Sequence, residues 1–268
     1  MLRIPLLVLA AAASAFPFAD AGGQVERLPV LMYHHLVTDE PESDAELHVD
    51  CFQKQMQFLH EHGYATLTLE EFERHHAQGA FPERSLLITF DDGYRSFLEH
   101  AYPLLRTFGF SSVVFPVVGL MPGLQRHIVF VDHLSFHEIR LMESLGGRID
   151  VGSHTYDLHD YGDAEHAMAL RQPGESVCDH HDRVRRDLLT SKLLLEAQTD
   201  REVDALAWPY GITTEALVDV AAEVGFALQF TTDVGYVTAA TPLTALPRFN
   251  VAAGPGPCFR EVVEQTLD

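Results

Sequence analysis

The stretch SLLITFDDG, residues 85–93, decides the fold of this chain. Its first part, residues 85–90, is a nearly continuous apolar run, which is typical of a strand in a sheet covered on both faces. The run ends at Asp91 and Asp92, and Gly93 follows. Adjacent side chains point to opposite sides of an extended strand, but where the strand ends and the chain turns, both carboxylates can face one pocket. Two carboxylates so close together can both stay ionised only if a cation or a hydrogen-bond donor compensates their charge. The alternative is a surface turn with two solvated carboxylates.

A second stretch, RIDVGSHTYDLH at residues 148–159, has the same organisation. A short strand over 148–152 is followed by His154 and His159, whose spacing of five does not suit one face of a helix, so a loop must carry them. One carboxylate and two imidazoles leave positions open on a zinc-like ion, as hydrolysis requires, and the remaining carboxylate can act as a base. The two stretches together predict a metal-assisted hydrolase. The alternative is unrelated surface histidines, since the chain has 16 and we treat most of them as background.

Strand-like and helix-like segments alternate from residue 28 to residue 251, without a linker or a repeat. The strands are expected at 28–33, 64–69, 85–90, 112–118, 148–152, 203–207, 226–231 and 243–251. The longer helices are expected from an N-cap at Asp50, over 95–108 with a break at Pro103, over 132–145 and 182–198, and from an N-cap at Thr213. This alternation predicts a parallel α/β domain, either a barrel or an open sheet. Both motifs fall where strands end, which is where barrel enzymes carry their active sites.

The first 21 residues have the composition of a secretory signal peptide. Arg3 precedes an apolar stretch over 4–16, and Ala19-Asp20-Ala21 is an A-x-A cleavage site. We therefore expect one domain over residues 22–268, secreted or periplasmic after cleavage. The alternative, a membrane anchor, is disfavoured because the stretch is short, contains Pro5 and Ser14, and is followed directly by Pro17. We expect no stable membrane span elsewhere.

The formal charge of −21 indicates that the chain does not bind nucleic acid. A polymer that carries free amines would be attracted, although the acidity could equally serve solubility alone. The three cysteines, Cys51, Cys178 and Cys258, are an odd number. One pair could form a disulfide in an oxidising compartment, and the spacing does not say which.

TFDDG (89–93) and SHTYDLH (153–159) resemble the first and second motifs of the polysaccharide deacetylases of carbohydrate esterase family 4, the NodB-homology group. The resemblance extends to VLMYH (30–34), AWPYG (207–211) and LPR (246–248). This order is similar to that of the poly-β-1,6-N-acetylglucosamine deacetylases, which act in making and exporting biofilm polymer. The resemblance covers residues 28 to about 251 and implies a distorted (β/α)7 barrel.

The resemblance also implies a set of site residues. Asp92, His154 and His159 would bind a divalent metal, for which we favour Zn²⁺ over Co²⁺, Ni²⁺ or Fe²⁺. Asp91 would be the general base, and the backbone N–H of Tyr210 would stabilise the tetrahedral oxyanion.

Two departures from the wider family concern the acid and base. The family has an Arg that orients the base where this chain has Ala207, and Arg248 is our candidate replacement. The family's C-terminal Leu-x-His motif is missing, because no His follows His181. His34 is therefore our candidate general acid, and His35 should point elsewhere by the alternation of a strand.

Trp208, the only Trp, and Pro209 are candidate substrate-binding residues. The indole could form an apolar wall against a sugar ring or could simply pack in the core. The function expected from the resemblance is metal-dependent removal of acetyl groups from N-acetylglucosamine units of an exported polysaccharide, with the export machinery as a candidate partner. The alternatives are deacetylation of chitin oligomers, peptidoglycan or xylan, cleavage of a small amide, or polysaccharide binding without catalysis.

Overall fold

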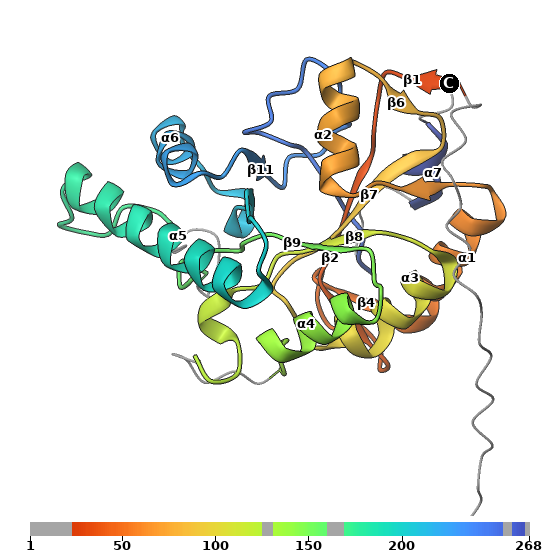
Figure 1. Cartoon of the computed structure of the whole chain (residues 1–268), viewed down its shortest axis with the longest axis horizontal. Coiled ribbons are helices and arrows are strands. Elements are labelled where there is room, and N and C mark those ends of the chain that lie inside the picture. Colours follow the sequence, from red (N-terminus) through yellow and green to blue (C-terminus); the bar gives the residue numbers. More distant parts are fainter. Residues whose placement is uncertain (1–22, 125–130, 160–168, 254–258, 266–268) are drawn as a thin grey trace, which may run out of the picture.

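The computed structural model describes residues 23–124, 131–159, 169–253 and 259–265 (Figure 1). The predicted signal peptide at 1–21 and Cys258 lie outside these ranges; Cys51 and Cys178 are exposed, free thiols. The helices are α1 (Val49–Glu61), α2 (Leu69–Gln78), α3 (Tyr102–Phe108), α4 (Phe136–Ser144), α5 (Val177–Thr199), α6 (Glu215–Val224) and α7 (Phe259–Glu264). None of these helices combines the length and the apolar character needed to cross a bilayer.

Parallel strands form the centre of the described chain. They are β2 (Val30–Tyr33), β7 (Ser85–Phe90), β8 (Ser112–Val114), β9 (Ile149–Val151), β10 (Ala205–Ala207), β11 (Leu228–Phe230) and β12 (Phe249–Asn250). Five of them form one sheet in the order β12-β2-β7-β8-β9, and β10 pairs with β11. Short strands flank this centre: β1 (Gln24–Val25) pairs with β6 (Phe81–Pro82), β3 (His35–Val37) with β4 (Glu46–His48), and β5 (Ala65–Thr66) with the start of β7.

The two groups of strands close into a ring through single bridges. Ser153 pairs with Leu206 between the β9 and β10 segments, and Phe230 pairs with Leu246, which lies just before β12. The result is a seven-stranded parallel barrel that is distorted at these two seams, where a single bridge replaces a ladder. The predicted distorted (β/α)7 barrel is confirmed, and the helices lie around its outside (Figure 1).

Strand β7 shows how alternation builds the two layers of the core. All six of its residues are buried. Leu87 belongs to the cluster that fills the barrel together with Phe115 and Phe230, whereas Ile88 packs in the cluster that contains residues of the surrounding helices. Because side chains alternate along a strand, the inward series Leu87, Thr89 and Asp91 carries one carboxylate into the barrel mouth.

Several helix starts differ from the predicted ones by up to five residues. Helix α1 is capped by His48 rather than Asp50, and α6 by Thr214 rather than Thr213. Helix α5 begins at Val177, five residues before the predicted start, because the hydroxyl of Ser176 accepts a hydrogen bond from the N–H of Asp179.

The predicted break at Pro103 is present. A π-helical turn over Phe97–Ala101 gives way to α3, and Pro103, which has no N–H to donate, lies in the first turn of α3.

Candidate metal centre and active site

The ends of neighbouring strands bring the predicted site residues to one end of the barrel. Tyr33 of β2 is level with Phe90 of β7, and Phe90 with Val114 of β8. His34 and Asp91 therefore leave the barrel side by side, and the N–H of Asp91 donates to the Tyr33 carbonyl at 2.9 Å.

A sharp turn after β7 lets both acidic side chains face inward. Asp92 and Gly93 have φ of 66° and 75°, in the left-handed region. At Gly93 a Cβ atom would lie 2.7 Å from the Cβ of Pro116, so no other residue fits without a shift. This turn is what places adjacent carboxylates in one site.

Asp92, His154 and His159 converge on one point. Oδ1 of Asp92 lies 3.4 Å from Nε2 of His154 and 3.3 Å from Nε2 of His159, and the three ligand atoms lie within 4.8 Å of one another. Oδ1 is buried and makes no conventional hydrogen bond. An oxygen and two ring nitrogens turned to a common point fit a divalent cation such as zinc.

The hydrogen bonds of the first histidine favour this arrangement. Nδ1 of His154 lies 2.7 Å from the carbonyl of Ala207. A carbonyl only accepts, so Nδ1 carries the proton and Nε2 keeps its lone pair for a metal. Burial lowers the pKa of His154, but the Asp92 and Asp91 carboxylates outweigh it and raise that pKa above its usual value in the metal-free protein. Burial raises the pKa of Asp92, yet the two imidazoles bring it well below the usual range.

Arg248 is bound to the candidate base. Its Nη1 and Nη2 donate to the two oxygens of Asp91 at 2.7 and 2.6 Å, and its Nε donates to the Thr231 carbonyl at 2.9 Å. The guanidinium is fully buried and lies over the adjacent rings of Phe115 and Phe230. Burial raises the pKa of Asp91, but Arg248 and nearby imidazoles lower it below the usual value, so the carboxylate is ionised and oriented. Arg248 thus contacts both oxygens of the candidate base, and Ala207 is buried in β10.

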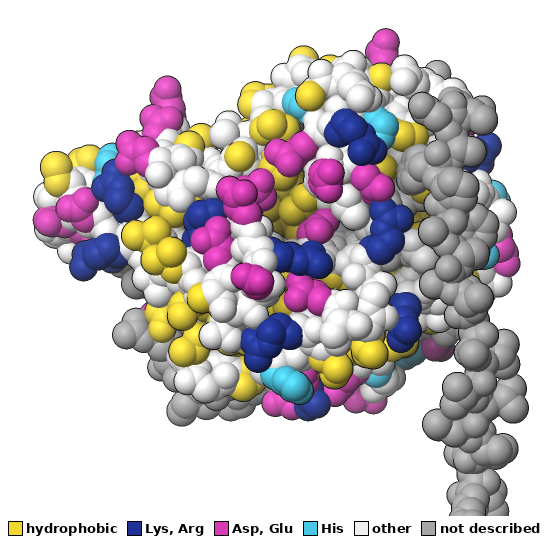
Figure 2. Space-filling view, viewed as in Figure 1, with side chains coloured by type: hydrophobic (Ala, Val, Ile, Leu, Met, Phe, Trp, Pro, Cys, Tyr) yellow, Lys and Arg dark blue, Asp and Glu magenta, His cyan; other side chains and the backbone are white. Residues whose placement is uncertain are grey.

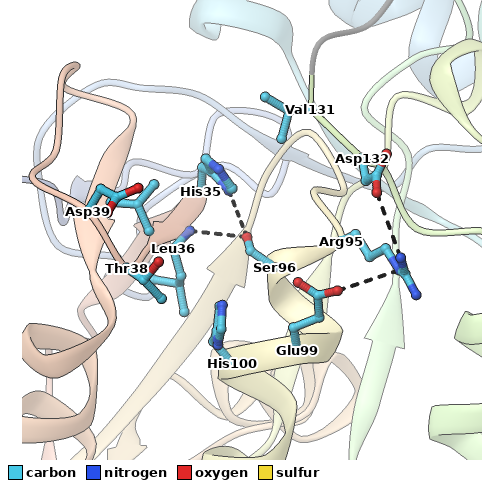
Figure 3. Close-up of a pocket in the computed structure, with 11 residues that line it drawn as sticks. His35, Leu36, Thr38, Asp39, Arg95, Ser96, Glu99, His100, Val131 and Asp132 are labelled. Carbon is cyan, nitrogen blue, oxygen red and sulfur yellow. Dashed lines mark hydrogen bonds and ion pairs between the residues drawn. The ribbon is translucent and has the colours of Figure 1, made fainter.

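His34 and His35 face different surroundings. Burial lowers the pKa of His34, and the Asp92 and Asp91 carboxylates partly offset this, so the ring lies within their electrostatic influence. The ring of His35 instead turns to Ser96, with Nδ1 2.8 Å from its hydroxyl (Figure 3). There it lines a cavity of about 460 Å³ together with Arg95 and the residues Leu36, Val37, Thr38, Asp39, Ser96, Glu99, His100, Val131 and Asp132.

The structure does not support Trp208 and Pro209 as substrate-binding residues. Trp208 is 0% exposed, and its indole N–H donates to the side-chain carbonyl of Gln229 at 3.0 Å. Pro209 is also buried, at the start of a 3-10 turn (Pro209–Gly211). Neither offers a surface to a sugar, because the strand–turn segment directs them into the core. Tyr210 does lie beside the site: its ring is 4.9 Å from that of His159, and its φ is 57°.

Two residues near the site gave no signal in the sequence. His133 is buried; burial lowers its pKa, while its Nδ1 bond to the Val131 carbonyl and the nearby Asp92 carboxylate partly raise it. It was one of many background histidines, and only folding brings it near Asp92. Asp187, in the middle of α5, binds the loop between His154 and His159. A lone Asp in a polar helix has no pattern that could have identified it.

The surface around the barrel carries charges of both signs. On the face shown in Figure 2, acidic and basic side chains are interspersed. The net charge of −21 is therefore not concentrated on this face as one acidic field.

Comparison with known proteins gives the family. A sequence profile of the polysaccharide deacetylases matches residues 78–228. YxkH of Bacillus subtilis, named as a polysaccharide deacetylase, is 27% identical over 89% of this chain and 76% of its own length. The poly-β-1,6-N-acetyl-D-glucosamine N-deacetylase of Escherichia coli is 25% identical over 87% of this chain, which spans only 38% of that protein.

The fold of this chain also matches that of a solved structure. IcaB from Ammonifex degensii superposes with a TM-score of 0.74 and 25% sequence identity, covering 92% of this chain and 99% of its own. The profile matches more than half of the chain and includes both the turn after β7 and the two histidines. This chain therefore belongs to the polysaccharide deacetylase family.

Proposed function

We propose that this protein is a metal-dependent hydrolase that removes acetyl groups from N-acetylglucosamine units of an exported polysaccharide. The observation that carries the proposal is the pairing of two groups: Asp92, His154 and His159 converge on one point, and Asp91 beside them is held by Arg248. Ligands and base on adjacent residues suit hydrolysis of an amide, which needs both an activated water and a stabilised oxyanion.

In this proposal Asp92, His154 and His159 would hold the metal, with Zn²⁺ favoured. A divalent ion bound there would polarise the acetyl carbonyl and lower the pKa of water. Asp91 accepts a proton from the water while the oxygen of that water attacks the carbonyl carbon. Arg248 keeps Asp91 ionised and fixes the direction of its free lone pairs, which is the part that an Arg at position 207 plays in the wider family.

The remaining steps use His34 and Tyr210. The backbone N–H of Tyr210 would donate to the oxyanion of the tetrahedral intermediate. When the C–N bond breaks, His34 would give a proton to the nitrogen, so that the products are acetate and a free glucosamine amine. Burial lowers the pKa of His34, so a larger fraction of its ring is protonated as the pH falls toward that pKa. The rate of the step in which His34 donates a proton should rise accordingly.

The names of the relatives favour a β-1,6-linked polymer. The E. coli relative is named for poly-β-1,6-N-acetyl-D-glucosamine. The alternative of a non-catalytic binder rested on the missing Arg at position 207, and the contact between Arg248 and Asp91 weakens that reason.

The proposal is tested by acetate release. The purified protein, stripped of metal and then reloaded with Zn²⁺, should release acetate from β-1,6-linked N-acetylglucosamine oligomers faster than from β-1,4-linked ones, and Asp92→Ala should not. Acetate release that is equal with and without metal would contradict the metal-dependent mechanism, and a preference for β-1,4 oligomers would contradict the linkage. Sequencing the N-terminus of the secreted protein would test the proposed cleavage before Gly22.

A further inference from the structure

Asp187 holds the loop between the two candidate histidine ligands. The N–H of Tyr156 donates to one of its carboxylate oxygens, and the N–H of Asp157 donates to the other, both at 2.8 Å. Two consecutive backbone donors are thus bound to one side chain from α5, which lies 30 residues further along the chain. Charge-assisted bonds of this kind are stronger than neutral ones.

A second contact from the same helix reinforces the loop. Ser191 lies one turn after Asp187, and its hydroxyl is 2.8 Å from that of Ser153. The Ser153 hydroxyl in turn accepts from the N–H of Thr155 at 3.0 Å, and the N–H of Leu158 donates to the Thr155 hydroxyl at 3.2 Å. Residues four apart on a helix share a face, so α5 presents one polar edge to the loop.

The loop needs such support because its own backbone is unfavourable. Thr155 has φ of 71°, a conformation that a β-branched residue rarely adopts. On its other side the loop accepts bonds from Val118 and Gly119. At Gly119 a Cβ atom would lie 2.5 Å from the carbonyl oxygen of Tyr156, so the approach is as close as a backbone allows.

The two histidines depend on this loop unequally. His154 is fixed by its own bond to the Ala207 carbonyl. His159 lies five residues further on, beyond the segment that Asp187 holds. Burial raises the pKa of Asp187 to about 7, although the two N–H donors lower it. Keeping an ionised carboxylate at this place therefore has a free-energy cost, which its bonds to the loop offset in part.

We propose that Asp187 is a positioning residue for metal binding: its carboxylate fixes residues 156 and 157 so that His159 stays within reach of Asp92. The inference rests on the proposed function only in taking His159 as a ligand. Outer partners of metal ligands change metal affinity by about 10- to 100-fold when they are removed. Asn cannot replace this carboxylate, because one of its two positions is an NH₂ group that would face a backbone N–H.

The experiment measures Zn²⁺ affinity of the full chain by competition with a chelating indicator. Asp187→Asn should weaken binding by about 10- to 100-fold. Asp182→Asn is the matched control: it removes a carboxylate from the same helix at an exposed position, where the side chain pairs with Arg185, and it should bind Zn²⁺ as the wild type does. A Co²⁺ absorption spectrum in the visible range should change in Asp187→Asn and not in the control.

Hydrogen exchange on the metal-free wild type keeps the test informative if Asp187→Asn fails to fold. The amides of Tyr156 and Asp157 should already be protected before metal is added, because the contact with Asp187 does not require the ion. Exchange of these amides at the rate of exposed loops would overturn the proposal, as would an Asp187→Asn protein that folds and binds Zn²⁺ within twofold of wild type. If Asp92→Ala also binds Zn²⁺ normally, the ligand assignment itself fails; if only Asp187→Asn does, the positioning role alone fails.

Discussion

Replacing Arg248 with Met should separate its electrostatic role from its packing role. Met fills much of the space of the arginine stem without its charge. Arg248 is 0% and Asp91 2% exposed at the side chain, and two hydrogen bonds of 2.7 and 2.6 Å join them. Removing one partner of such a pair leaves a buried, uncompensated carboxylate, which typically costs about 3–5 kcal/mol. A protein of this kind has a total stability of about 5–15 kcal/mol, so Arg248→Met should fold but be much less stable at neutral pH.

The loss should depend on pH in a defined direction. In the wild type the pKa of Asp91 is lowered on folding, so this group stabilises the fold above its unfolded pKa of about 3.9, and the contribution is lost as the pH falls through the folded pKa. Without Arg248 burial dominates, and the folded pKa of Asp91 should rise above the unfolded value. The variant then loses stability as the pH rises from about 4 through that raised pKa, so the gap between wild type and variant should widen toward pH 7.

Urea unfolding of both proteins between pH 4.5 and 7.5 measures this gap, with acetate release measured alongside. Acetate release should fall by about 10²-fold or more at neutral pH, because the base is no longer fixed and is partly protonated. The double variant Asp91→Asn/Arg248→Met should be more stable at pH 7.5 than Arg248→Met alone, since it no longer has an unpaired carboxylate buried at position 91. A gap that stays constant with pH, or a double variant that is less stable than the single one, would refute the reasoning.

Three further outcomes follow from the site. His159→Ala should reduce the bound metal far below one ion per chain, as measured by elemental analysis, because three ligands leave no redundancy; a full complement of metal would remove His159 from the ligand set. Asp91→Asn should keep its metal and lose about 10²- to 10⁴-fold in acetate release; near-normal turnover would mean that another residue is the base. His34→Ala should lower acetate release by about 10²-fold with metal retained, whereas His35→Ala, whose ring turns to Ser96, should do much less. Equal, small effects of both would leave His34 a structural role only.

Local patterns in the sequence predicted much of the fold. The apolar run 85–90 ending at two carboxylates marked a buried strand, because in a covered parallel sheet both faces of a strand are apolar. Pro103 marked a break because it lacks an N–H, and a π-helical turn gives way to α3 there. Helix starts were less well predicted: α5 begins at Val177 because a side-chain bond from Ser176 sets its end, and such a bond depends on the local conformation rather than on apolar spacing.

The residue types of the site were predictable, and their arrangement was not. Asp92, His154 and His159 stand where strands end, and the carboxyl ends of parallel strands meet at one end of a barrel. The approach of Arg248 to Asp91 spans 157 residues of sequence and depends on the closure of the barrel through β12. No local pattern encodes that distance, so Arg248 could be named from the sequence only as a candidate.

The tertiary structure alone decided which polar and aromatic groups face the site. Trp208 is of a residue type that can pack against a sugar ring, but the direction of the chain after β10 places its side chain in the core. Asp187 and His133 have no motif, and they reach the site only because α5 and the segment before α4 fold against it. Sequence thus determined the chemistry available at the strand ends, since residue types and alternation are local. Packing between distant segments determined which of those groups meet, because contact across the barrel is a property of the closed fold.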